Sequence, residues 1–83
     1  MPQQIKPADG VYRCQDRVNG NRDFPVVFSN GEAGCIFGDF VEEPGPIFRL
    51  EHYDPPVYIA FYDDGTFALV KPGPDAGGNY TQV

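Results

Sequence analysis

The stretch VYIAFYDDGTFALVK, residues 57–71, indicates the fold class because it predicts two short strands joined by a tight loop. A three-residue loop, Asp63 to Gly65, pairs Tyr62 with Thr66 and requires a left-handed Gly65. A two-residue turn would instead scatter the large apolar side chains over both faces. The three-residue register gathers five apolar residues on one face: Val57, Ile59, Phe61, Phe67 and Leu69. Because a one-residue slip exchanges core for solvent, this coherent face favours the three-residue loop.

Turn signals divide the rest of the chain in the same way. Ten glycines and nine prolines interrupt it too often for long helices, and no segment keeps apolar residues at helical spacing. Short connections favour an antiparallel meander, which must close into a small barrel or fold into a two-sheet sandwich, because no helix covers its apolar face. The expected fold is therefore all-β, of SH3-like or OB-like size, with six strands at about residues 10–18, 24–29, 33–41, 46–53, 57–62 and 66–71.

Two other turns can be assigned from their chemistry. Asn30-Gly31 tolerates the positive φ of a two-residue hairpin turn that pairs Ser29 with Glu32. A tight turn at Asn19-Gly20 would oppose like charges, so a longer loop is expected there. The inward faces predicted from these registers contain Val26, Phe28, Ala33, Cys35 and Phe37 on the hairpin around Asn30, and Phe48 and Leu50 with His52 on the next strand.

A single domain is expected over residues 10–71, and its core should be thin and rich in aromatics, since the chain has seven Phe and five Tyr. Residues 1–9 and 72–83 lack apolar periodicity. They are expected to form a flexible N-terminal segment and a flexible C-terminal tail.

The first residues, MPQQIKP, have neither the basic start nor the apolar stretch of a secretion signal, and no run approaches membrane-spanning length. A cytoplasmic protein with no membrane contact is expected. Cys14 and Cys35 should then be free thiols. Two cysteines and one histidine do not supply a zinc ligand set, so neither a metal nor another cofactor is expected.

Catalysis has little support in the sequence. His52 has no nucleophile and carboxylate near it in a familiar motif, and only a tertiary contact with Cys14 or Cys35 would make a nucleophilic pair. Glycine-rich phosphate loops are absent. The prediction is no enzyme and no catalytic residue.

The chain is acidic, with a net charge of −6 and a pI of about 4.4. Direct nucleic-acid binding is disfavoured because it needs clustered Lys and Arg. The meander predicts that four carboxylates, on the connections after residues 41 and 62, meet at one end of the barrel beside the first loop, with Arg17, Arg22 and Asp23. Either this acidic end binds a partner with a basic surface or it only keeps the chain soluble.

The leading functional hypothesis is a non-enzymatic protein-binding module of accessory or inhibitor type. Tyrosines that fall opposite the core residues of their strands suit an interface. One alternative is a nucleic-acid mimic that blocks a DNA- or RNA-binding protein, as phage anti-restriction and anti-CRISPR proteins do; another is a structural subunit of a viral or other assembly. The partner and the oligomeric state stay open. The predicted partner-binding residues are Glu42, Glu43, Asp63, Asp64, Tyr53, Tyr58 and Tyr62.

Overall fold

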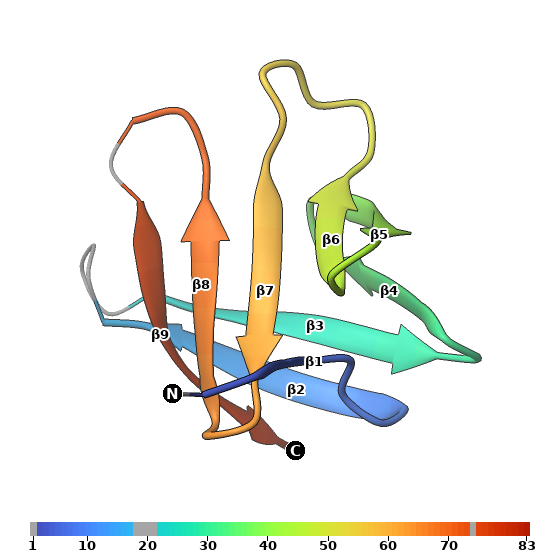
Figure 1. Cartoon of the computed structure of the whole chain (residues 1–83), viewed down its shortest axis with the longest axis vertical. Helices are drawn as coiled ribbons and strands as arrows, with labels where there is room; N and C mark the ends of the chain where they lie inside the picture. Colours follow the sequence, from blue (N-terminus) through green and yellow to red (C-terminus); the bar gives the residue numbers. More distant parts are fainter. Residues whose placement is uncertain (1, 18–21, 74) are drawn as a thin grey trace.

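The computed structural model describes residues 2–17, 22–73 and 75–83, and these residues form nine strands and no helix (Figure 1). The all-β prediction is confirmed. No helix in this described part of the chain is long and apolar enough to cross a membrane. The strands are β1 (Gln4–Ile5), β2 (Gly10–Asp16), β3 (Asp23–Ser29), β4 (Glu32–Cys35), β5 (Gly38–Glu43), β6 (Ile47–Leu50), β7 (Tyr58–Tyr62), β8 (Thr66–Val70) and β9 (Ala76–Gln82).

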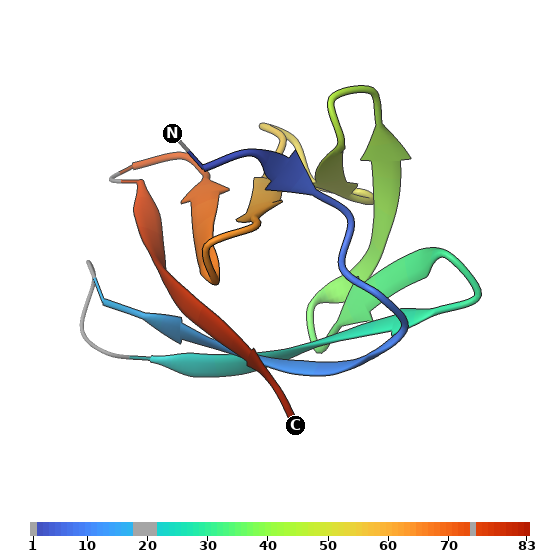
Figure 2. The same ribbon diagram turned by 60° about the horizontal axis from the view of Figure 1, so that its bottom comes forward.

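Eight of these strands close into a barrel. From β2 to β9 each strand pairs antiparallel with the next, and β9 also pairs with β2, with Tyr12 opposite Gln82 and Asp16 opposite Gly78. Figure 2 shows the strands arranged around a common axis. Of the two predicted architectures, the structure has the barrel.

The predicted terminal segments take part in the sheet, which corrects the expectation that they are flexible. β9 lies between β2 and β8, so residues 76–82 complete the barrel. β1 pairs with the second half of β7, where Gln4 lies opposite Tyr62 and Ile5 opposite Phe61. Backbone hydrogen bonds hold both segments in the sheet, although neither segment has the apolar periodicity from which a strand is predicted.

Both predicted hairpin registers are confirmed. Gly65 has φ +86°, and its amide donates to the Tyr62 carbonyl over 3.2 Å. Phe61 then lies opposite Phe67. At the other hairpin, Ser29 lies opposite Glu32, and Asn30-Gly31 forms the two-residue turn, with both residues at positive φ.

Two predicted strands end earlier than expected. The strand predicted over 33–41 is broken at Ile36 and Phe37, which form a turn between β4 and β5, so Phe37 is exposed and not buried with Val26 and Phe28. Likewise β6 stops at Leu50 and His52 adopts φ +64°, so its side chain faces solvent and not the core. In both places the chain turns, and the strand alternation used for the prediction no longer applies.

In the first hairpin Gln15 lies opposite Asp23. A tight turn at Asn19-Gly20 would have placed the like charges of Asp16 and Asp23 opposite each other, and the structure does not have this pairing. That turn itself lies outside the described residues.

Aromatic rings fill the barrel interior. Phe28 packs edge-to-face with Phe48 and Phe61, each at 5.4 Å between ring centroids, and Tyr80 packs on Phe61 at 5.0 Å. Eight strands leave an interior just wide enough for side chains, so this cluster is the core. Cys14 is fully buried beside it.

Candidate binding site at the open end of the barrel

The two ends of the barrel are built differently. Strands β3, β5 and β7 finish at one end, where residues 3–9 run across; we call this the closed end. Strands β2, β4, β6 and β8 finish at the other, which we call the open end. Figure 1 shows β1 near the lower end of β7, away from the loop that joins β6 to β7 at the top.

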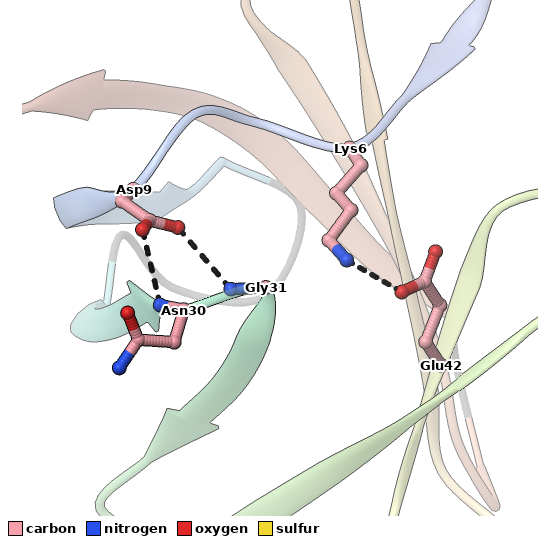
Figure 3. Close-up of polar contacts among 5 residues, drawn as sticks. All are labelled: Lys6, Asp9, Asn30, Gly31 and Glu42. Atoms are coloured by element: carbon pink, nitrogen blue, oxygen red, sulfur yellow. Dashed lines mark hydrogen bonds and ion pairs between the residues drawn. The ribbon is translucent and has the colours of Figure 1, made fainter.

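The N-terminal segment is bonded to the turns of the closed end (Figure 3). Lys6 Nζ lies 2.7 Å from a carboxylate oxygen of Glu42. Asp9 accepts hydrogen bonds from the amides of Asn30, at 3.0 Å, and Gly31, at 3.4 Å. These contacts link the N-terminal segment to β5 and to the turn between β3 and β4.

The four predicted carboxylates lie at this closed end, two at the end of β5 and two in the loop after β7. Their shared end is as predicted. The first loop was predicted to lie beside these carboxylates, but its residues Arg17, Arg22 and Asp23 lie at the opposite end of the barrel. The cause is the additional turn at residues 36–37, which adds a strand and reverses the direction of those that follow.

Each of these carboxylates has a partner within the chain. Besides the Lys6–Glu42 pair, Glu43 pairs with Arg49 at 2.5 Å, and Asp63 accepts the amide of Gln3. The closed end is therefore a network of contacts and not a cluster of free charges.

Asp64 is engaged by Thr66. It accepts the Thr66 hydroxyl at 2.6 Å and the Thr66 amide at 3.1 Å. The hydroxyl is the larger cause of a lowered Asp64 pKa, because it stabilises the ionised form.

The predicted tyrosines separate. Tyr58 and Tyr62 are half-buried on β7, and the Tyr62 carbonyl accepts a hydrogen bond from Tyr80. Tyr53 lies in the loop between β6 and β7 at the open end, where it is 44% exposed. No single surface therefore holds all seven predicted residues.

The open end contains a cavity of about 260 Å³, which we call the mouth pocket. Aromatic and aliphatic side chains supply most of its lining, and all come from strand ends or loops of this end. They are Phe24, Phe37, Phe40, Leu50, Tyr53, Val57 and Leu69, with Cys35 and the charged residues Asp16, Arg22 and Lys71.

Two exposed apolar side chains, Phe37 and Tyr53, line the mouth pocket, and Ile36 is exposed beside Phe37 in the same turn. We call these three residues the apolar rim. Ile36 is 72% exposed and Phe37 58% exposed. The Tyr53 hydroxyl donates to the Phe37 carbonyl at 3.5 Å, which joins the two loops. Tyr53 was among the predicted partner-binding residues, whereas Ile36 and Phe37 were not, because Ile and Phe favour strands and only the flanking Gly34 and Gly38 indicated a turn.

Cys35 lines the mouth pocket, whereas Cys14 is buried in the core, and both are free thiols. Burial raises the pKa of Cys14 to about 12, and Cys35 nearby adds to the effect. Burial also raises the pKa of Cys35, and hydrogen bonds from the Phe37 and Gly38 amides offset part of this rise by lowering it. Neither thiol is therefore an activated nucleophile at neutral pH.

His52 does not form a nucleophilic pair with either cysteine. Its side chain is 90% exposed, and the nearest carboxylate, Glu51, is 3.9 Å away. Within the described residues no group of three or more His, Cys, Asp or Glu side chains could hold a metal ion.

A larger hollow of about 440 Å³ lies outside the barrel on β3, β4 and β5. Polar and acidic groups, including Glu32, Asp39 and Glu51, supply most of its lining. Water can satisfy these polar and acidic groups, so this hollow leaves less apolar surface uncovered than the mouth pocket does.

Comparison with protein families, with curated proteins and with solved structures finds no match to this chain.

Proposed function

We propose that this chain is a non-enzymatic protein-binding module, of accessory or inhibitor type, that takes an apolar side chain of its partner into the mouth pocket. The observation that carries the proposal is the apolar rim. Ile36 and Phe37 occupy the tip of a tight turn, a position usually taken by Gly, Asn, Asp or Ser. They are exposed there, so neither the turn nor the core accounts for them.

The shape of the site supports a protein partner. Pockets for drug-sized ligands span about 300–1,000 Å³, and the mouth pocket is smaller, at about 260 Å³. It suits one large side chain better than a whole cofactor. The projecting rim beside it supplies further contact area, and aromatic anchors in a desolvated centre carry most of the energy in protein interfaces.

The closed end is a weaker candidate for the interface. Its carboxylates are already engaged by Lys6, Arg49, Gln3 and Thr66, so a basic partner would have to displace existing contacts. In this proposal the net charge of −6 keeps the chain soluble. The free thiols favour a reducing compartment, the cytoplasm.

The test is capture of the partner from an extract of the source organism with matched variants. Ile36→Ser with Phe37→Ser removes the rim at the open end. Val11→Ser with Val27→Ser is the control, because these two valines are 42% and 43% exposed on the outer face of the barrel. Circular dichroism verifies that each variant keeps its fold.

We expect the wild type and the valine control to retain the same stoichiometric protein, and the rim variant to lose it. A variant with Glu42, Glu43, Asp63 and Asp64 replaced by lysine should still retain it. Loss in the lysine variant with full retention by the rim variant would place the interface at the closed end instead. Elution by DNA and by moderate salt would favour the nucleic-acid mimic.

A further inference from the structure

The mouth pocket has charged groups at its edge that narrow the chemistry of the partner segment. We propose that this segment presents a large apolar side chain with one carboxylate next to it, and that the carboxylate pairs with Arg22 and Lys71. The inference rests on the proposed function, because it assigns a partner chemistry to the same pocket.

Two cations of the pocket, Arg22 and Lys71, have no ion-pair partner among the residues that the structure describes. Lys6, Arg13 and Arg49 form ion pairs with carboxylates, and Arg17 donates to Gln15. Arg22 and Lys71 form neither an ion pair nor a side-chain hydrogen bond with another described residue. They lie on different loops, before β3 and after β8, yet line one cavity.

The pocket has one anion of its own. Asp16 is buried at 7% exposure and already engaged within the protein. The lining therefore has a formal charge of +1, in a chain whose net charge is −6. This local excess of positive charge favours an entering carboxylate over an ammonium group.

The same charges limit how acidic the segment is. The negative net charge repels a run of carboxylates during approach, whereas a single carboxylate beside an apolar anchor meets mainly the two cations. The apolar lining favours a large apolar side chain in the partner segment, because a purely polar segment would leave Phe24, Phe40 and Leu69 in contact with water. A combined apolar and acidic segment satisfies both parts of the pocket.

The experiment uses the accessible thiol of the pocket as its reporter. Cys35 lines the mouth pocket, so an occupant slows its alkylation by iodoacetamide, while Cys14 stays protected by burial. Four blocked peptides are compared on the intact protein at pH 8: Gly-Phe-Asp-Gly, Gly-Phe-Asn-Gly, Gly-Phe-Lys-Gly and Gly-Ser-Asp-Gly. Octanoate is added as a small amphipathic anion.

We expect the Phe-Asp peptide to protect Cys35 at about fivefold lower concentration than the Phe-Asn peptide, and the Phe-Lys and Ser-Asp peptides to protect least. Arg22→Gln with Lys71→Gln should abolish the difference between Phe-Asp and Phe-Asn. Lys6→Gln, which removes a cation at the closed end, should retain it.

Equal protection by the Phe-Asp and Phe-Asn peptides overturns the inference and leaves the proposed function standing. Equal protection by Ser-Asp and Phe-Asp also overturns it, because the site would then bind anions alone. Protection by octanoate but by no peptide overturns it in favour of a small-molecule ligand. Absence of protection by every Phe peptide contradicts the proposed function itself.

Discussion

Gly65 illustrates how one residue fixes the register of a hairpin. Its φ of +86° is unfavourable for a residue with a Cβ, although a Cβ built there meets no atom within 4 Å. The cost of a substitution is therefore one of backbone conformation alone. This separation of strain from crowding makes the position a clean test of the three-residue loop.

We predict that Gly65→Ala lowers the free energy of unfolding by about 1–2 kcal/mol. Gly65→Asn should cost less, because asparagine tolerates the left-handed region, as Asn30 does at φ +53°. Urea denaturation of the two variants and the wild type measures the difference. Equal stability of Gly65→Ala and the wild type would contradict the assigned loop.

The buried thiol of Cys14 predicts a loss of stability in alkali. Its pKa rises from 9.0 to about 12 on folding, so the folded chain keeps a proton that the unfolded chain releases. Below about pH 9 the buried thiol makes its full contribution to the free energy of unfolding, about 4 kcal/mol. This contribution is lost as the pH rises from about 9 to about 12. Cys35 and Tyr80 have raised pKa values too and act in the same direction.

Denaturation at several pH values tests this linkage. We expect the free energy of unfolding to decline from pH 9 upward, and Cys14→Ala to decline less steeply, whatever the variant's stability at neutral pH. A slope that is identical in the variant would show that Cys14 releases its proton at the same pH in both states.

Among the elements, β9 is the one on which barrel closure depends. It passes between β2 and β8 so closely that a Cβ on Gly78 would lie 1.9 Å from the Gln15 carbonyl oxygen. A Cβ on Gly77 would lie 2.9 Å from the Phe67 carbonyl oxygen. These backbone atoms cannot move without breaking strand pairing.

We predict that Gly78→Ala destabilises the fold by more than about 3 kcal/mol, because the backbone of Gln15 and Arg17 on the β2 side must shift to admit the methyl group. Asn79→Ala, at an exposed position of the same strand, is the control and should cost less than about 1 kcal/mol. Thermal denaturation followed by circular dichroism compares them. Similar melting temperatures for both variants would contradict the close approach.

Strand β9 could not be predicted from the sequence, in contrast to the two hairpins. The hairpins around Asn30-Gly31 and Gly65 were predictable, since turn chemistry and apolar alternation lie within one short segment. The residues Ala76-Gly77-Gly78-Asn79 have no such alternation, and the need for glycine arises only from the distant strands on either side. The tail therefore looked flexible although it closes the barrel.

The turn at Ile36 and Phe37 had the opposite problem. Both residues favour strands, so a single strand over 33–41 was the natural prediction. Surface exposure of a turn tip is a property of the folded barrel, and the local sequence does not encode it. Missing this turn changed which loops were placed at which end.

At the scale of the whole molecule, the barrel has a closed end held by the N-terminal segment and an open end with an apolar mouth. The predicted carboxylates belong to the closed end, whereas only Tyr53 of the seven predicted residues reaches the mouth pocket. Charge could be counted from the sequence, but the pocket is assembled from strand ends far apart in the chain. Its existence could not be predicted before the barrel closure was known.

Nuclear magnetic resonance can show whether a partner's apolar side chain occupies the open end of the barrel. Backbone amide shifts of the ¹⁵N-labelled protein are followed while the Gly-Phe-Asp-Gly peptide is added. We expect the largest changes at Cys35 to Gly38 and at Tyr53, with Gln3 to Asp9 unchanged. Largest changes at Gln3 to Asp9, or on the outer face at Val11 and Val27, would contradict it.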